Sequence, residues 1–203
     1  MQLNQDVAYL TGFVIGDGNV SSKSGNYLVR AVEENEIFIN SFAELFEKVF
    51  NRKPKVYFDR YNNSYVAWIH SKQIWEHFVS DLEVPSGDKS TTVKVPNWIK
   101  ICDESIKAAF LRGLFDAEGS VIPIKNKSKN NVQISFKVNN QVLGSEVFEI
   151  LKKLGIDARL YLYEYPREKF SMIHINGRER CKQFLEKVGF NHQIKKQKLI
   201  QLL

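Results

Sequence analysis

The sequence predicts an α+β protein built from two repeats, each with the element order αββαββα. An apolar segment that ends on an acid and a glycine occurs twice, as YLTGFVIGDGNV from Tyr9 and as FLRGLFDAEGSV from Phe110. The two copies lie 101 residues apart, and each is followed by a hairpin, an amphipathic helix and a second hairpin. A chain of 203 residues accommodates one domain or two small ones, and the duplication favours two.

The first repeat follows from four local patterns. The apolar run that ends at Asp17 predicts a helix, and residues 19–34 predict a hairpin because turn residues interrupt them. Residues 35–50 predict a second helix, and residues 55–78 predict a hairpin that closes on a third helix ending near Phe78. The second helix has apolar residues at helical spacing, namely Ile37, Phe38, Phe42, Leu45 and Phe46.

The second repeat shows the same succession. Its motif helix ends at Glu118, a hairpin follows over 120–140, and a hairpin from Arg159 closes on a helix ending near Phe184. The intervening helix has its own apolar positions, namely Val142, Leu143, Val147, Ile150 and Leu151. Residues 84–107 are rich in turn residues and contain two prolines. We therefore divide the chain into a first repeat (1–83), a linker (84–107) and a second repeat (108–203).

The charge distribution favours a polyanionic partner. The net charge is +6, and residues 101–203 hold 18 Lys and Arg against 11 Asp and Glu, so this half carries +7. No apolar run is long enough for a membrane span, and no secretory leader is evident. Two cysteines make neither a disulfide framework nor a zinc site with the four histidines. We expect a soluble intracellular protein, in the cytoplasm or nucleoid or in an organelle, with no membrane partner.

Small residues four apart mark one face of each motif helix. Such spacing lets two helix backbones approach closely, so the two helices are expected to pack on each other. Close packing alone is a sufficient explanation of these residues. The residues expected at this helix interface are Gly12, Gly16, Gly113 and Ala117.

The acids that end both motif helices require another explanation. A helix C-terminus carries partial negative charge, so Asp17 and Glu118 occupy positions where a carboxylate is disfavoured. Gly18 and Gly119, which follow them, match ordinary C-terminal caps. If the helices lie parallel, the two acids converge, as in two-metal phosphodiester hydrolysis. Asp116 aligns with Ile15 and is interpreted as an auxiliary or structural acid.

The segments LTGFVIGDG and LRGLFDAEG resemble the paired motifs of the LAGLIDADG homing endonucleases in their single-chain, two-motif form. This resemblance implies a pseudo-twofold monomer in which two curved, four-stranded antiparallel sheets form a saddle over double-stranded DNA. The motif helices would pack at the repeat interface. It implies a site-specific double-strand break in a long target that leaves short 3′ overhangs. Two or more Mg²⁺ ions are implied, and Ca²⁺ is expected to bind without supporting cleavage.

The resemblance also assigns roles to particular residues. The metal ligands would be Asp17 and Glu118 with the backbone carbonyls of Gly16 and Ala117, the residues before each acid. Family members usually place a basic residue on a sheet near each scissile phosphate, and strand alternation nominates Lys137. The alternative is that Lys137 is simply an exposed strand lysine. Its aligned first-repeat residue is Val32, with Arg30 on the same face, so the role is not symmetric.

Strand alternation nominates the residues that would contact DNA. With Leu160 and Leu162 inside, their neighbours turn outward, and the same holds beside Val56 and Phe58. Hairpin-turn lysines, including Lys129, would contact the phosphate backbone. The DNA-binding set is Asn19, Ser21, Lys23, Arg30, Lys55, Tyr57, Ser120, Lys125, Lys127, Gln133, Ser135, Lys137, Asn139, Arg159, Tyr161 and Tyr163.

Two other classes of function stay open from the sequence. A non-cleaving nucleic-acid binder on the same scaffold, either an intron RNA maturase or a DNA-binding regulator, would add intron RNA as a partner. Relatives of that kind can lose one or both motif acids, whereas this chain retains both, which favours cleavage. A duplicated structural domain would leave the basic second half unexplained.

Overall fold

The computed structural model describes residues 2–88, 92–125, 130–166 and 168–203. The first half contains α1 (Gln5–Asp17), β1 (Gly18–Lys23), β2 (Asn26–Glu33), α2 (Glu36–Phe50), β3 (Lys55–Asp59), β4 (Ser64–His70), α3 (Lys72–Glu76) and the π-helical turn η1 (His77–Asp81). The rest contains α4 (Asn97–Ile101), α5 (Glu104–Glu118), β5 (Gly119–Lys125), β6 (Asn130–Val138), α6 (Gln141–Lys153), β7 (Arg159–Tyr165), β8 (Glu168–Asn176), α7 (Arg178–Lys187) and α8 (Gln193–Leu202).

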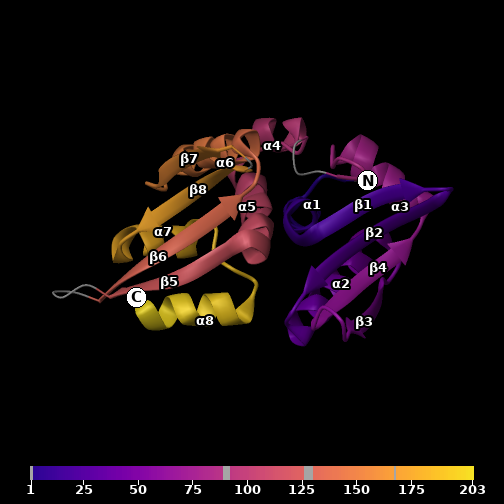
Figure 1. The fold of residues 1–203 in the computed structure, drawn as a ribbon, viewed down its shortest axis with the longest axis horizontal. Helices are drawn as coiled ribbons and strands as arrows, with labels where there is room; N and C mark the ends of the chain where they lie inside the picture. Colours follow the sequence, from indigo (N-terminus) through magenta and orange to yellow (C-terminus); the bar gives the residue numbers. More distant parts are fainter. Residues whose placement is uncertain (1, 89–91, 126–129, 167) are drawn as a thin grey trace.

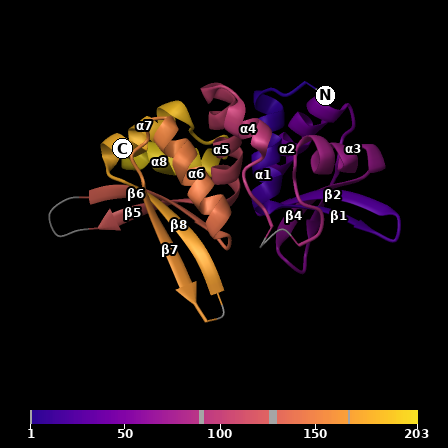
Figure 2. The same cartoon turned by 90° about the horizontal axis from the view of Figure 1, so that it is seen from above.

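The predicted fold class is confirmed. Each half contains an antiparallel four-stranded sheet, with the orders β1-β2-β4-β3 and β5-β6-β8-β7. The registers correspond, since Gly18 pairs with Ala31 in one half and Gly119 with Phe136 in the other. In Figure 1 the motif helices α1 and α5 lie between the two sheets. Figure 2 shows the helices gathered above the sheets, with the β7–β8 hairpin extending away from them, so the sheets form the two sides of a saddle.

The motif helices pack against each other with almost no space between their backbones. A Cβ atom on Gly12 would lie 2.1 Å from the carbonyl oxygen of Phe110, and one on Gly113 would lie 2.1 Å from that of Tyr9. Farther along, a Cβ on Gly16 would lie 2.4 Å from the Cβ of Ala117. The contacts are reciprocal between the two motifs, which is the signature of a twofold-related interface.

Replacing Gly12 or Gly113 by alanine is expected to lower the free energy of unfolding by about 1–3 kcal/mol, the usual cost of overpacking. Alanine favours a helix over glycine, but here its Cβ would overlap a backbone oxygen that cannot move alone. Urea unfolding measures the change, with Lys182→Ala on the exposed side of α7 as the control. Unchanged stability in both glycine variants would contradict the tight interface.

The structure corrects several boundaries. The third helix of the first half does not end near Phe78 but continues through η1 to Asp81. Helix α5 starts at Glu104, as the capping residue Asp103 in the sequence DES predicts, and the Asp103 side chain accepts a hydrogen bond of 3.0 Å from the Ile106 amide. Two helices, α4 and α8, were not expected from the repeat pattern. Within the described ranges, no helix is long and apolar enough to cross a bilayer.

Four apolar side chains expected inside are exposed instead. Phe58 is 44% exposed and Leu162 is 55% exposed. They lie on the edge strands β3 and β7, where a side chain has a neighbouring strand on one side only, so period-2 alternation does not imply burial there. Ile37 and Val142, in the first turns of α2 and α6, are 74% and 57% exposed. Each helix turns its first apolar residue away from the sheet.

Candidate functional site

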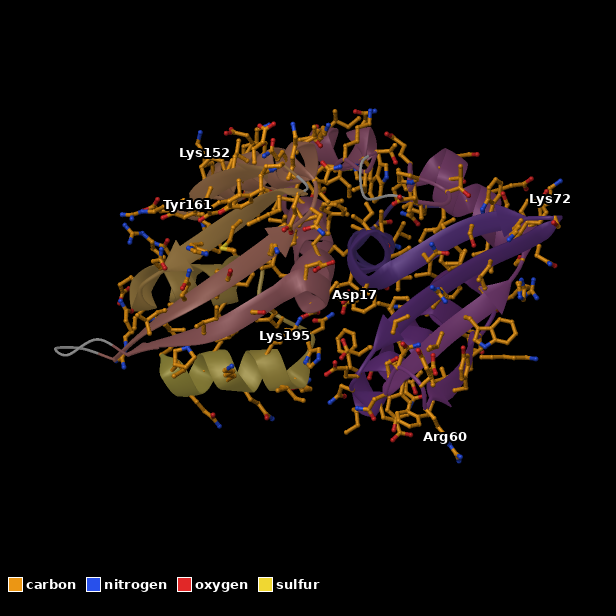
Figure 3. The ribbon with its side chains drawn as sticks, in the orientation of Figure 1. Asp17, Arg60, Lys72, Lys152, Tyr161 and Lys195 are labelled. Carbon is orange, nitrogen blue, oxygen red and sulfur yellow. The ribbon has the colours of Figure 1, made fainter. Side chains whose placement is uncertain are left out.

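The two motif acids lie at the same end of a parallel helix pair. Asp17 is the last residue of α1 and Glu118 is the last residue of α5. The helices touch next to these acids, because a Cβ on Gly16 would lie 2.4 Å from the Ala117 Cβ and 3.3 Å from the Glu118 Cγ. Figure 3 shows Asp17 where the two halves meet. The folding of two separate local patterns thus brings both acids to one place.

The glycines after these acids do not act as left-handed caps. Gly18 has φ −99° and Gly119 has φ −78°, so the chain passes directly from each helix into an extended strand. Glycine is required by close approach instead. A Cβ would lie 2.6 Å from the Val14 Cα at Gly18 and 2.4 Å from the Phe115 carbonyl oxygen at Gly119. Both glycines are the C-cap residues of their helices, as expected, and their backbone amides donate to the carbonyls of Val14 and Phe115.

Two cavities flank the converging helix ends. The first cavity is lined by Asp17, Ala117, Glu118 and Lys195, together with Arg30 and Val32 from β2. The second cavity is lined by Gly16, Glu118 and Lys137, together with Asn19 and Asn139. Each cavity therefore combines a motif acid with the residue that precedes the acid of the opposite motif. Among the described residues, each also has one lysine in its lining.

Lys195 of α8 is a site residue that the sequence did not suggest. Its ammonium group donates hydrogen bonds to the α5 carbonyls of Phe115 (3.4 Å) and Ala117 (2.9 Å), and to that of Asp116. Burial lowers the pKa of Lys195, while the carboxylates of Asp116, Glu33, Asp17 and Glu118 act to raise it. A cation thus compensates the negative end of α5. Figure 3 shows Lys195 close to Asp17 in the space between the halves.

Asp116 is fully buried beside these acids and makes three hydrogen bonds. Its carboxylate accepts from the Tyr9 hydroxyl (2.8 Å), the Asn191 amide (3.0 Å) and the His192 amide (3.1 Å). Burial raises the pKa of Asp116, although these donors act to lower it. Burial and the neighbouring carboxylate also raise the pKa of Tyr9 well above its usual value. Asp116 therefore links α1, α5 and the start of α8, as a structural acid would.

The segment before α8 also contacts the first half. The His192 ring stacks on Phe38 with centroids 4.7 Å apart, and its Nε2 lies 3.6 Å from the Glu33 Oε1. Burial acts to raise the pKa of Glu33, but hydrogen bonds from His192 and the Asn35 amide outweigh it, so this pKa lies below its usual value. His192 itself is only 5% exposed. The C-terminal segment thus ties the two repeats together next to the motif ends.

Lys137 lines the second cavity but already has partners on its own sheet. Its Nζ lies 3.4 Å from the Glu168 Oε1 and 4.2 Å from the centre of the Phe170 ring. Both members of the ion pair are 48% exposed, so the pair contributes little to stability and exchanges readily with solvent. Lys137 is therefore available to a polyanion that reaches the second cavity.

The residues nominated for DNA contact fall into three groups. Exposed ones include Lys23, Arg30, Lys55, Tyr57, Ser120, Lys137, Asn139 and Arg159. Half-buried ones are Asn19, Ser21, Tyr161 and Tyr163. Gln133 and Ser135 were expected to point outward but are each only 8% exposed, because they lie on the central strand β6 between the side chains of β5 and β8. Lys125 ends β5, whereas Lys127 and Lys129 lie outside the described residues.

Aromatic side chains form part of the same sheet faces. Lys55 lies over the Trp68 ring at 5.5 Å, and Tyr161 stacks near Tyr163 with centroids 6.5 Å apart. His174 lies 5.1 Å from Tyr161. Rings and cations alternate on these faces, which suits contacts to both bases and phosphates.

The donor set at the helix ends suits a hard divalent cation. Carboxylate and carbonyl oxygens are the preferred ligands of Mg²⁺, which retains several waters. Among the residues that the structure describes, no group of three or more His, Cys, Asp or Glu side chains is placed to hold a metal ion. A metal here would therefore use the pair Asp17 and Glu118 with backbone carbonyls and water. The Ala117 carbonyl already accepts a hydrogen bond from Lys195.

Comparisons with family models match both halves of the chain. Residues 6–85 match the WhiA LAGLIDADG-like domain, and residues 105–189 match a LAGLIDADG-like domain. The two matches leave only the segment between the repeats and the two ends of the chain uncovered. They coincide with the two motif helices and the sheets that follow them.

Several curated proteins are similar to this chain. The homing endonuclease I-ApeI of Aeropyrum pernix is 27% identical over 96% of this chain and 86% of its own length. The tRNA-splicing ligase RtcB of Methanopyrus kandleri is 25% identical over 94% of this chain. The chain spans only 21%, 17% and 10% of the first three curated relatives, whose names differ from one another.

Solved structures share the fold. The structure of I-DmoI in complex with DNA and Mn has a TM-score of 0.66 and 23% identity, covering 93% of this chain and 98% of that one. Full-length DUF199/WhiA from Thermatoga maritima has a TM-score of 0.63 and 14% identity, covering 98% of this chain and 59% of that one. The doubled motif, the two family-model matches and the shared fold agree: the chain belongs to the LAGLIDADG family, as a single-chain member with two motifs.

Proposed function

We propose that this protein is a site-specific homing endonuclease that makes a double-strand break in a long DNA target. The observation that carries the proposal is the meeting of Asp17 and Glu118 at the ends of α1 and α5, between the two sheets. Cleavage would be metal-dependent phosphodiester hydrolysis that leaves short 3′ overhangs. The similarity to I-ApeI and the fold shared with I-DmoI, solved with DNA and Mn, support this function.

The metal ligands would be Asp17 and Glu118 with the carbonyls of Gly16 and Ala117. When bound, two or more Mg²⁺ ions would supply an activated water and stabilise the leaving oxygen. The two carboxylates are held in place because each ends a motif helix, and the two motif helices pack tightly against each other. Ca²⁺ would occupy the same ligands without supporting cleavage.

Two lysines would stabilise negative charge on the reacting phosphates. Of the lysines that the structure describes, Lys137 lines the second cavity and Lys195 lines the first. A fixed cation near developing phosphate charge lowers the barrier more in a confined site than in water. Lys137 thus has a counterpart after all, but it comes from α8 rather than from the first sheet.

The sheet faces would bind double-stranded DNA through the exposed residues described above. The first repeat (1–83) and the second (108–203) would each address one half of the target, joined by residues 84–107, so a monomer contains both halves. Gln133 and Ser135 would contribute less than the exposed residues because they are nearly buried.

Selection of cleaved sites from a randomised duplex library tests the proposal. With Mg²⁺, recovery of one long preferred sequence cut on both strands is expected. With Ca²⁺, the same sequence should be bound and left intact. Binding without any cleavage in Mg²⁺ would overturn the proposal and favour a non-cleaving binder of DNA or intron RNA, a reading to which the WhiA-like match of residues 6–85 lends weight.

Target affinity in Ca²⁺ is expected to fall steeply with salt. Proteins that make six to ten phosphate contacts lose roughly 10³–10⁵ in affinity between about 50 and 200 mM salt, because counterions are released on binding. Fluorescence anisotropy with a labelled duplex measures the slope. Arg159→Ala should reduce the slope of log affinity against log salt concentration by about one. An affinity that does not change with salt would contradict a phosphate-binding saddle.

A further inference from the structure

The carboxylate of Asp116 contacts the chain just before the C-terminal helix α8 begins. Asp116 is 0% exposed, and an unpaired buried carboxylate would be strongly unfavourable. Two of its three hydrogen-bond donors are consecutive backbone amides, those of Asn191 and His192, which directly precede α8. Moving this segment would leave the carboxylate without those donors. Asp116 therefore fixes the first residues of α8 against α5.

Among the described residues, the start of α8 has no side-chain capping hydrogen bond from its N-cap residue. His192 is the N-cap residue, and its side chain makes no capping hydrogen bond. A carboxylate near the first amides of a helix is electrostatically favourable as well as hydrogen-bonded. The position of α8 along its axis thus depends on Asp116 more than on a local cap.

Lys195 lies three residues beyond His192, within the first turn of α8. From there its ammonium group returns to the C-terminal carbonyls of α5, including Ala117 at 2.9 Å. These contacts form a closed loop. The Asp116 side chain binds the amides just before α8, and Lys195 of α8 binds the carbonyl of Ala117, the residue after Asp116. A shift of α8 would displace Lys195 from the first cavity.

The first repeat has no equivalent of this loop. The position aligned with Asp116 is Ile15, which is buried and apolar. The second cavity instead receives Lys137 directly from strand β6. The loop reaches the first cavity through His192 and Lys195, and none of its residues is among those that line the second.

We propose that Asp116 is a positioning residue that places Lys195 in the first cavity through the amides of Asn191 and His192. The expected effect of this positioning on catalysis rests on the proposed nuclease function. Its consequence is asymmetric: loss of the Asp116 carboxylate should slow the cut of one strand and spare the other.

Single-turnover cleavage with each strand separately labelled tests this consequence. Asp116→Asn keeps one acceptor oxygen and loses the other, and it should slow one strand by about tenfold to a hundredfold, as for other residues that orient a catalytic group. The other strand should stay within about twofold, so nicked product accumulates. Lys195→Met should slow the same strand. The double variant should be no slower than Lys195→Met alone, because the two residues act in series.

Matched variants separate positioning from general destabilisation. Tyr9→Phe removes the hydroxyl donor to Asp116 but keeps both amides, so it should leave the ratio of the two strand cuts unchanged. His192 has φ −64°, which proline adopts, so His192→Pro removes the amide donor that His192→Ala retains. Only the proline variant should show the strand-selective loss. Equal slowing of both strands by Asp116→Asn, or additive effects with Lys195→Met, would overturn the proposal.

A measurement without DNA or metal keeps this inference distinct from the nuclease proposal. In NMR spectra of the free protein, contacts between the Lys195 side chain and the end of α5 should be lost in Asp116→Asn and His192→Pro. They should persist in Tyr9→Phe and His192→Ala. Contacts that survive in all four variants would refute the positioning role, whereas failure of the wild-type protein to cut DNA would refute only the function.

Discussion

Asp17→Asn and Glu118→Gln should each abolish double-strand cleavage, with rates reduced by at least about 1,000-fold and target affinity in Ca²⁺ changed by less than about tenfold. Both substitutions keep side-chain size and remove the charge that would hold a divalent cation. The two acids end helices that are locked together by Gly12 and Gly113, so the loss is one of ligand chemistry rather than of fold.

Single-turnover cleavage and anisotropy binding on one target duplex measure both effects. Glu104→Gln is the matched control, because it removes an exposed carboxylate from the first turn of the same helix α5. It should cleave at the wild-type rate. Strong residual cleavage by either motif variant would sink the assignment of these acids as metal ligands.

Lys137→Met and Lys195→Met should convert the enzyme into two nickases of opposite strand preference. The two lysines line different cavities, and the loss of one fixed cation near a reacting phosphate costs roughly 10²–10³ in rate. Methionine keeps the length of the side chain and removes its charge. The double variant should cut neither strand at a measurable rate.

Supercoiled plasmid with a single target site measures this outcome, since nicked and linear products separate on a gel. Lys196→Met, next to Lys195 on the exposed side of α8, is the matched control and should give linear product as the wild-type does. If both lysine variants slow the same strand, the division of the two cavities between two strands is wrong.

Most of the fold is local in origin and was predictable for that reason. Both hairpin pairs and the helices α2 and α6 show periods of 2 or 3.6 over enough residues to be read directly, and the motif helices are continuous apolar runs. The errors fall where a partner element decides the outcome. Phe58 and Leu162 alternate correctly but lie on edge strands, and Gln133 and Ser135 alternate correctly but lie on a central strand beneath larger neighbours.

The missed site residues have the same cause. Lys195 stands in a basic stretch, QIKKQK, that differs little from other surface runs of this chain. Nothing local shows that α8 returns across the end of α5, because the Asp116–His192 hydrogen bond joins residues 76 positions apart. Asp116 aligns with the apolar residue Ile15, so a comparison of the two repeats does not single it out as a site residue. The two positions differ because the contact between Asp116 and the segment before α8 belongs to the second half.

By itself, the sequence determined the repeat, the motif helices, their small-residue interface and the two acids at their ends, because each depends on short-range periodicity and on residue type. Only the tertiary structure decided which groups surround those acids. The position of α8, the burial of Asp116 and the placement of Lys195 and Lys137 on opposite sides of the helix pair depend on packing between distant segments. Such contacts are set by the mutual fit of surfaces that no local pattern records.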